Sequence, residues 1–235
     1  MQIKDSVVFI TGANRGLGLA FARAALAAGA KKVYAAARDP KSVTLPGVVP
    51  IALDVTRPDE AAAAARECGD VTLLINNAGI SRGASALAVD AFDKARAEFE
   101  TNFFGPWALS RAFAPVLAAN GGGAIINVLS ILSWLTLPGA VSYSASKSAA
   151  WSLSNALRAA LRAQGTQVLS LHVAFMDTDM TSGIPGPKAS PDEVVKKTLE
   201  ALEAGKFEVL ADPLTQQVKA GLSAELPPYA VERAG

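Results

Sequence analysis

A glycine-rich turn near the N-terminus is the feature that most constrains the fold of this chain. Four apolar residues, Val7 to Ile10, lead into Gly12, Gly16 and Gly18, and an alanine-rich helical pattern follows at once. The order of strand, glycine turn and helix is typical of a phosphate site, because main-chain N–H groups at the start of a helix attract anions. Three glycines suit a sharp turn, a close approach of the backbone to a pyrophosphate, and tight packing of helix on strand. An ordinary tight turn between a strand and a helix is the alternative.

Composition favours one large domain whose partner is a small molecule. The chain has 235 residues, of which 51% are hydrophobic, and this is enough to cover both faces of a sheet. The net charge is +1, from 22 basic and 21 acidic residues without a basic cluster, so a nucleic-acid partner is not expected. The single cysteine, Cys68, cannot form an internal disulfide, suits a reducing compartment and is interpreted as a packing residue.

Two stretches of the sequence bear on membranes and targeting. The first residues, Met1 to Ser6, are polar and lack the apolar core of a signal peptide, so we expect a cytoplasmic protein. The uncharged stretch 121–146 is interrupted by Asn127, several serines and Pro138-Gly139. It therefore predicts a buried strand followed by a loop, and no membrane partner is expected.

Strand-like and helix-like patterns alternate along the chain. Strands are expected at residues 7–10, 32–37, 48–53, 71–75, 124–129, 167–173 and 207–210, and helices at 19–29, 59–67, 89–119 with an interruption at Gly105-Pro106, 143 to about 162, and 190 to 203 or 204. This alternation predicts a single doubly wound Rossmann-type α/β domain over residues 1–235, with about seven parallel strands and helices on both faces. A glycine- and proline-rich segment at about 179–195 suits a lid over a substrate. The tail, Asp212 to Gly235, is too polar and proline-rich to form a further domain.

The end of the second strand bears on the choice of cofactor. In dinucleotide folds an acidic residue there holds the adenosine ribose, but here Ala37 takes that place and Arg38 follows. Without the acid a 2′-phosphate is not repelled, and a guanidinium binds phosphate in a bidentate manner, so NADP is favoured over NAD. Arg15 adds a second cation in the glycine turn. The alternative is that Arg38 is a solvated residue at the end of a strand.

Two further strand ends carry candidate binding residues. Asp54 either accepts a hydrogen bond from an adenine amino group or caps the helix that begins near Asp59, and the sequence leaves both open. The stretch Asn76 to Gly79, with two asparagines, an alanine and a glycine, can lie against a ribose. By itself it is also compatible with an ordinary turn.

Tyr143 and Lys147 are four residues apart at the start of an expected helix and therefore share one face. A carbonyl that receives a hydride needs a proton on its oxygen, and the ordinary pKa of tyrosine is too high for ready proton exchange at neutral pH. A neighbouring ammonium lowers that pKa by favouring the phenolate. Ser130, at the end of the preceding strand, can hold the substrate oxygen. The alternative for the tyrosine and lysine is an ordinary amphipathic pair. Asn102 is unfavourable inside a helix, and its alternatives are a surface position or a kink beside Pro106.

Taken in order, TGANRGLG from Thr11, NNAG from Asn76, Asn102, Ser130 and YSASK from Tyr143 resemble the short-chain dehydrogenase/reductase family, over Val7 to about Met180. The resemblance implies that Tyr143 is the acid/base and that Ser130 holds the substrate oxygen. It further implies that Lys147 lowers the tyrosine pKa and holds the nicotinamide ribose, and that Asn102 belongs to a proton relay. A homodimer or homotetramer is also implied, with contacts through the helices that carry Asn102 and Tyr143.

The resemblance extends to the loop after the sixth strand, with one departure. Thr178 fits the residue that binds the nicotinamide carboxamide, but Val173-Ala174 replace the usual Pro-Gly pair, which leaves the course of this loop open. No metal site is expected, and the residues expected to contact NADP(H) are Gly12, Asn14, Arg15, Gly16, Leu17, Gly18, Arg38, Asp54, Val55, Asn76, Ala78, Gly79, Tyr143, Lys147, Met176 and Thr178.

The expected activity is reversible hydride transfer between NADP(H) and a ketone or aldehyde and its alcohol. A mainly hydrophobic substrate is suggested by the apolar residues expected at the pocket, which are Trp134, Leu135, Leu137, Phe175, Met176 and Ile184. Two alternatives are an NADP-binding sensor without turnover and an epimerase or dehydratase with the same fold. The only histidine, His172, is expected to be a buried strand or edge residue rather than a catalytic base.

Overall fold

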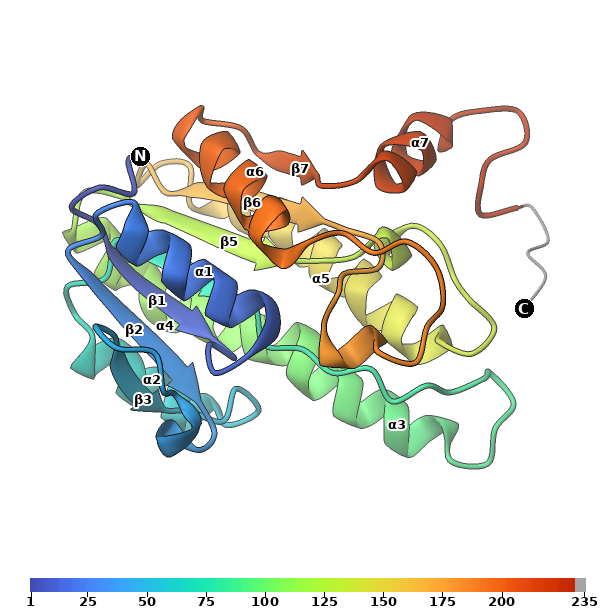
Figure 1. The fold of residues 1–235 in the computed structure, drawn as a ribbon, viewed down its shortest axis with the longest axis horizontal. Coiled ribbons are helices and arrows are strands. Elements are labelled where there is room, and N and C mark those ends of the chain that lie inside the picture. The colour runs from blue at the N-terminus through green and yellow to red at the C-terminus, as the bar shows by residue number, and fades with distance from the viewer. Residues whose placement is uncertain (231–235) are drawn as a thin grey trace.

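A parallel sheet of seven strands forms the centre of the molecule, and helices cover both of its faces (Figure 1). The computed structural model describes residues 1–230. The strands are β1 Val7–Thr11, β2 Lys32–Ala37, β3 Val49–Ala52, β4 Leu73–Asn76, β5 Ala124–Val128, β6 Gln167–His172 and β7 Glu208–Leu210. The helices are α1 Gly16–Ala27, α2 Pro58–Glu67, α3 Ala91–Phe99, α4 Gly105–Ala119, α5 Val141–Ala160, α6 Pro191–Glu203 and α7 Pro213–Gly221.

The strand order is β3-β2-β1-β4-β5-β6-β7, and every neighbouring pair is parallel. The direction in which successive strands are added reverses between β1 and β4. In open α/β sheets this reversal leaves a crevice at the carboxyl ends of the strands, where ligands bind. The predicted doubly wound fold is confirmed, and the glycine turn lies at this crevice because it follows β1.

Alternate residues of one strand belong to two separate cores. Val8 and Ile10 of β1 pack in the core that contains α1 and α6, whereas Val7 and Phe9 pack in the core that contains α2, α4 and α5. The ring of Phe9 lies 4.8 Å from that of Phe113 on α4. Because both faces are covered, the strands are apolar along nearly their whole length.

The expected long helix at 89–119 is two helices joined by one wide π turn, Glu100–Phe104. The predicted interruption at Gly105-Pro106 is wrong, because these two residues begin α4. Proline is compatible with the first turn of a helix, where its missing N–H group has no intrahelical partner. The real irregularity lies one turn earlier and contains Asn102.

The tail contains a helix that the sequence did not predict. Asp212 caps α7 by accepting a hydrogen bond from the main-chain N–H of Thr215 at 2.9 Å. The last part of the tail, from residue 231, lies outside the described residues. Cys68 is fully buried, which confirms its interpretation as a packing residue.

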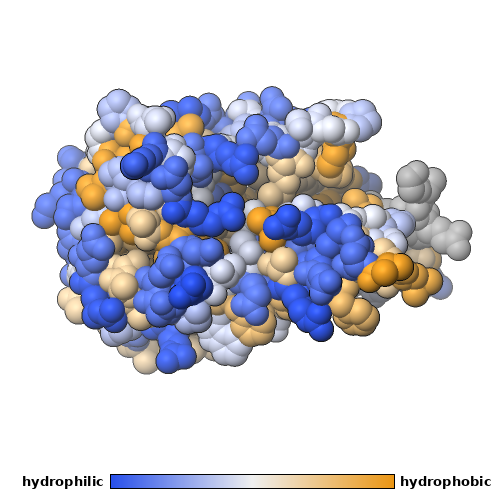
Figure 2. Space-filling model, turned by 90° about the horizontal axis from the view of Figure 1, so that it is seen from below, coloured by the Kyte–Doolittle hydropathy of each residue, from blue (hydrophilic) through white to orange (hydrophobic). Residues whose placement is uncertain are grey.

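Among residues 1–230, every helix is too short or too polar to cross a bilayer. The face shown in Figure 2 mixes hydrophilic and hydrophobic residues.

Candidate active site

The turn between β1 and α1 has the geometry of an anion cradle. Gly12 and Gly16 have φ values of +63° and +53°, a region that side chains other than glycine rarely adopt. A Cβ atom on Gly18 would lie 2.1 Å from the carbonyl oxygen of Gly12, so the turn packs this closely only with glycine. The N-cap residue Arg15 makes no side-chain cap bond, and the first turn of α1 has no acidic residue. The N–H groups at the start of α1 are therefore suited to binding an anion.

Thr11 and Asn77 fasten this turn to the loop after β4. The hydroxyl of Thr11 accepts hydrogen bonds from the main-chain N–H groups of Asn77 and Ala78, each at 3.0 Å. The amide of Asn77 donates to the carbonyl oxygens of Thr11 at 2.8 Å and Gly12 at 3.1 Å. Thr11 was not singled out from the sequence, and Asn77 was included only as part of the stretch Asn76 to Gly79. The only available signal was the pair of adjacent asparagines, which does not tell which one reaches the turn.

The expected role of Asn76 is wrong for its side chain. Asn76 is the last residue of β4 and is buried, and its amide donates to Asn127 at 2.8 Å and to Ser110 at 3.2 Å. This side chain therefore ties β4 to β5 and α4 inside the core. Its neighbour Asn77 makes the contact with the glycine turn.

Arg38 and Asp54 lie together beyond the ends of β2 and β3, where they line one groove. Asp54 accepts hydrogen bonds from the main-chain N–H and the hydroxyl of Thr56, at 3.0 and 2.8 Å. Burial tends to raise the pKa of Asp54, but these two hydrogen bonds and the charges of Arg38 and Arg57 lower it overall. Helix α2 begins at Pro58 after Arg57, so the alternative in which Asp54 caps that helix is wrong.

The segment after β6 lies beside the glycine turn. A Cβ atom on Gly16 would lie 3.6 Å from the methyl group of Thr178, so Thr178 is next to the start of α1. Met176 pairs with Ala189 in an isolated parallel bridge, and its carbonyl oxygen accepts a hydrogen bond from Thr181. Residues 176–189 therefore form a loop that is closed at its base.

One ion pair connects the turn before α1 to this loop, and a second ion pair connects α1 to α6. Arg15 lies 3.0 Å from Asp179, and Arg23 lies 3.1 Å from Asp192 on α6. All four side chains are largely exposed, so each pair contributes little to stability. Arg15, expected to bind phosphate, is thus paired with the loop in this structure.

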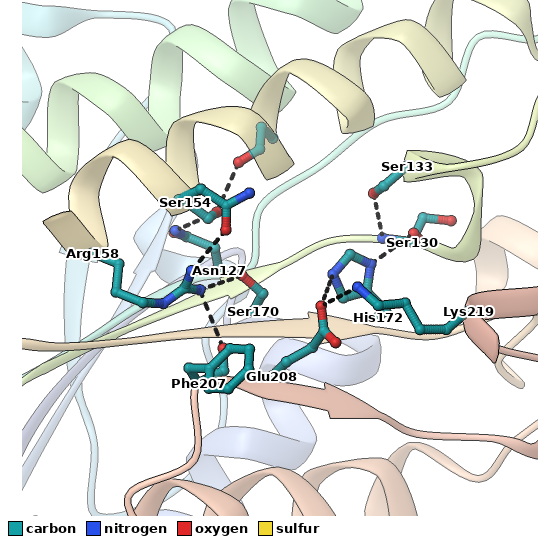
Figure 3. Close-up of polar contacts among 12 residues, drawn as sticks. Asn127, Ser130, Ser133, Ser154, Arg158, Ser170, His172, Phe207, Glu208 and Lys219 are labelled. Atoms are coloured by element: carbon teal, nitrogen blue, oxygen red, sulfur yellow. Dashed lines mark hydrogen bonds and ion pairs between the residues drawn. The ribbon is translucent and has the colours of Figure 1, made fainter. Parts of the chain in front are cut away.

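Three polar residues meet at the carboxyl end of β5, as the sequence predicts. Ser130, labelled in Figure 3, follows β5 as the N-cap of a short 3₁₀ turn. Its hydroxyl oxygen accepts a hydrogen bond from the N–H of Leu132 at 3.1 Å. The ammonium of Lys147 lies 5.7 Å from the centre of the Tyr143 ring. It donates to the carbonyl oxygen of Val128 at 2.9 Å.

Burial has the largest effect on the pKa values of Tyr143 and Lys147. It raises the pKa of Tyr143 to about 12, against the hydrogen bond with Ser130, and the negative charge of Glu98 acts in the same direction as burial. Burial also lowers the pKa of Lys147 to about 8. In this state the phenol is protonated and can donate a hydrogen bond. The pKa of Tyr143 is therefore raised in this structure, and the lowering expected from Lys147 is not found.

Asn102 holds the loop after β4 against α5. Its carbonyl oxygen accepts from the N–H of Ile80 at 2.9 Å, and its amide donates to the carbonyl oxygen of Ile80 at 2.9 Å and to Ser146 at 3.0 Å. Only 1% of Asn102 is exposed, so the surface alternative is wrong. A Cβ atom on Gly79 would lie 3.2 Å from the Asn102 carbonyl oxygen and 3.6 Å from the Lys147 nitrogen, which places Gly79 beside both.

Glu98 is a buried carboxyl group that sequence reasoning missed. One oxygen accepts from the N–H of Arg82 at 2.6 Å, and the other has no hydrogen-bond partner among the described residues. Its position four residues before Asn102, on the same side of the helix, was the only signal available.

The apolar residues expected at the pocket fall into two groups. Trp134 and Leu135 pack with α7 and its neighbours, and Leu135 is buried in a cluster with Val218. Ile184 is 37% exposed on the loop beside the glycine turn. His172 is fully buried in β6, which confirms the prediction of a core histidine.

The remaining sequence candidates lie along the β1–β4 crevice. Leu17 and Val55 are buried, and Asn14 and Ala78 are half-buried. A Cβ atom on Gly105 would lie 3.0 Å from the carbonyl oxygen of Val55, so α4 closes this side of the crevice.

Comparison with known proteins connects this geometry to one family. Residues 6–188 match the family model described as short chain dehydrogenase. A curated relative, Dehydrogenase/reductase SDR family member 7B from Bos taurus, is 34% identical over 90% of this chain and 75% of its own length. The protein of the same name from Mus musculus is 33% identical over 76% of this chain, and the match spans 60% of the mouse protein.

A solved structure is similar over nearly the whole chain. It is that of a short chain dehydrogenase from Burkholderia cenocepacia J2315 in complex with NADP, with 43% identity, a TM-score of 0.92, and coverage of 96% of this chain and 95% of that one. The family match covers well over half of the sequence and includes both the glycine turn and the group around Tyr143. The chain therefore belongs to the short-chain dehydrogenase family of oxidoreductases.

Proposed function

We propose that this protein is an NADP(H)-dependent carbonyl reductase that interconverts a ketone or aldehyde and its alcohol. The observation that carries the proposal is the meeting of Ser130, Tyr143 and Lys147 beside Gly79, at the same edge of the sheet as the glycine turn. The dinucleotide, when bound, supplies the hydride that this chemistry needs.

The cradle fits a dinucleotide on structural grounds. A Cβ atom on Gly18 would collide with the turn, and the start of α1 has neither a side-chain cap nor an acidic residue, so N–H groups remain for a pyrophosphate. Gly79 and Thr178 would hold the nicotinamide half, because Gly79 lies beside Lys147 and Thr178 lies beside Gly16 of the cradle. The similar Burkholderia structure, at 43% identity, contains NADP.

Arg38 supports the choice of NADP over NAD. It follows β2 without an acidic neighbour at Ala37, and its charge acts on Asp54 across the groove. An arginine here binds a 2′-phosphate, and no carboxylate at the end of β2 repels it. Arg15 would supply a second cation once it separates from Asp179.

Tyr143 acts as the proton donor during carbonyl reduction. Its pKa of about 12 keeps the phenol protonated at neutral pH, and its hydrogen bond with Ser130 places the two hydroxyls where both reach one substrate oxygen. As the carbonyl carbon is reduced, the proton moves from the Tyr143 oxygen to the developing alkoxide. The ammonium of Lys147 then stabilises the phenolate that remains, because opposite charges at this range favour the ionised form.

The substrate is mainly hydrophobic, and residues 179–190, which precede α6, close over it. Met180 and Ile184 expose apolar side chains on this segment, beside the glycine turn. Such a loop excludes water from the reacting oxygen and strengthens the hydrogen bonds made to it.

The test is consumption of NADPH over a panel of ketones and aldehydes by the wild-type protein and by Tyr143→Phe. We expect the variant to lose at least about 100-fold in kcat with little change in NADPH affinity, because a general acid contributes 10²–10⁴-fold. Tyr229→Phe is the matched control, since Tyr229 is exposed. Wild-type activity in Tyr143→Phe refutes the proposed mechanism, and NADPH binding without turnover on any substrate favours the sensor alternative.

A further inference from the structure

The backbone of Ser130 is held by a histidine from the neighbouring strand. The Nδ1 atom of His172 lies 3.2 Å from the carbonyl oxygen of Ser130 (Figure 3). A carbonyl oxygen only accepts, so Nδ1 is the protonated nitrogen in this contact. That carbonyl belongs to the peptide that joins Ser130 to Ile131, the first residue of the 3₁₀ turn. The same oxygen accepts from the N–H of Ser133 at 3.0 Å, so the histidine adds a second hydrogen bond to the carbonyl at which the chain enters this turn.

A second pair of residues faces the other edge of the imidazole ring. The Nε2 atom of His172 lies 3.6 Å from a carboxylate oxygen of Glu208 on β7 (Figure 3). The ammonium of Lys219 on α7 lies 3.0 Å from the same oxygen. The ring also stacks on Trp134, with centroids 4.0 Å apart, and Lys219 lies 4.6 Å above the Trp134 ring. The stack on Trp134 sets the plane of the His172 ring, and Lys219 contacts both Trp134 and Glu208.

The electrostatic surroundings keep this ring neutral. Burial lowers the pKa of His172 to about 3, against the hydrogen bond with Ser130, and the charges of Lys219, Lys147 and Arg158 lower it further. Glu208 faces the ring with its charge compensated by Lys219. A neutral ring with its proton on Nδ1 has a lone pair on Nε2, and Nε2 has no hydrogen-bond partner among the described residues.

Helix α7 is attached to the same region at two further points. The cap residue Asp212 accepts a hydrogen bond from the N–H of Ala174 at 2.8 Å, next to the end of β6. Val218 packs with Ile131 and Leu132 of the 3₁₀ turn. The match to the family model ends at residue 188, so β7 and α7 lie beyond the matched region.

We propose that His172, oriented by its stacking on Trp134, is a positioning residue that supports the backbone of Ser130 and hence the direction of its hydroxyl. The proposal rests on the role given to Ser130 under the proposed function. It assigns α7 to the support of the active site.

The first test reads the hydrogen bond without any enzyme activity. The chain has one histidine, so uniform ¹⁵N labelling of histidine gives one imidazole signal set from the full-length protein. At neutral pH, without cofactor or substrate, we expect Nδ1 to be protonated and Nε2 unprotonated. A proton on Nε2, whether alone or in addition to Nδ1, overturns the proposal. This result stands whether or not a ketone substrate is found, so it separates this proposal from the proposed function.

The second test compares two replacements of His172. Asparagine keeps an N–H donor near the position of Nδ1, whereas leucine has a similar volume and no donor. We expect His172→Leu to lose about tenfold or more in kcat, with KM and NADPH affinity nearly unchanged, and His172→Asn to stay within about threefold of the wild type. A folded His172→Leu protein with wild-type kcat, or a His172→Asn protein no better than His172→Leu at equal thermal stability, overturns the proposal.

If His172→Leu does not fold, variants of the partly exposed Lys219 decide the question. Lys219→Met leaves the Glu208 carboxylate uncompensated beside Nε2, so we expect the pKa of His172 to rise. It also removes the cation over Trp134, on which the His172 ring stacks, so we expect kcat to fall by about threefold or more. Lys219→Arg should restore the wild-type pKa of His172 and the wild-type kcat. Lys196→Met, on the exposed side of α6, should change neither the pKa nor kcat. Unchanged kcat and an unchanged imidazole spectrum in Lys219→Met overturn the proposal.

Discussion

Replacing Lys147 by methionine is expected to make the protein more stable at neutral pH while it removes activity. Lys147 is 4% exposed, and burial lowers its pKa from 10.5 to about 8. Below pH 8 the folded protein therefore holds a buried ammonium that an unfolded chain would expose to water. One unit of pKa corresponds to about 1.4 kcal/mol, so this burial costs the folded state about 3 kcal/mol at neutral pH. Methionine has a similar length and carries no charge.

The pH dependence gives the sign and the size of the effect. Between about pH 8 and pH 10.5 the unfolded chain binds more protons at this lysine than the folded chain, so the free energy of unfolding of the protein with Lys147 rises with pH. Tyr143 acts in the opposite direction above about pH 10, since its pKa is raised in the folded state. The comparison is therefore made in a Tyr143→Phe background, which removes the second titration.

The assay is urea unfolding followed by tryptophan fluorescence, from the three tryptophans of the chain, in steps from about pH 7 to pH 10. The free energy of unfolding with Lys147, minus that with Lys147→Met, should rise by about 2 to 3 kcal/mol over this range. The packing terms do not depend on pH, so they do not contribute to the change of this difference with pH. Lys206→Met, at an exposed position, is the control and should show no such rise. If the free energy of unfolding depends on pH in the same way with and without Lys147, the assignment of a buried ammonium with a lowered pKa is refuted.

Three other predictions address the cofactor, the cradle and assembly. Arg38→Ala should weaken NADPH binding by about tenfold or more and leave NADH binding nearly unchanged, because a charge-assisted hydrogen bond is worth about 1.5–3 kcal/mol. Isothermal titration calorimetry measures both affinities, and Arg66→Ala, at an exposed position, is the control. An unchanged NADPH affinity in Arg38→Ala would contradict the phosphate role. Gly18→Ala should destabilise the protein by about 1–3 kcal/mol and weaken binding of both cofactors, because the new Cβ meets backbone at 2.1 Å. Thermal unfolding of that variant is compared with Gly139→Ala, where a Cβ meets nothing within 4 Å, and equal melting temperatures would show that the close packing does not matter. If the expected homo-oligomer forms through the π turn and α4, which expose Phe104 and Trp107 respectively, then Trp107→Glu should reduce the mass measured by light scattering, and an unchanged assembly would place the contact elsewhere.

Local patterns were enough to predict the order of the elements. The strands β1 to β7 and the helices α1 to α6 lie close to their expected positions, because apolar runs, glycine turns and helix start signals are short-range properties of the sequence. Tyr143 and Lys147 could be paired for the same reason, since four residues apart on a helix always share a face. The shift of the helix break from Gly105-Pro106 to the turn around Asn102 shows the limit of such rules, because a π turn has no sequence signature of its own.

The sequence by itself determined the fold class, the phosphate cradle and the types of residue available for proton transfer, because each of these follows from neighbours along the chain. Only the tertiary structure decided which of two adjacent asparagines reaches the glycine turn, that Glu98 lies buried near Tyr143, and that Lys219 of an unpredicted helix stands behind Ser130. These contacts join residues far apart in the sequence, and they depend on the order of strands in the sheet. The titration of Tyr143 and Lys147 belongs to the same class, since burial, which only the folded chain creates, outweighs the effect that their spacing predicts.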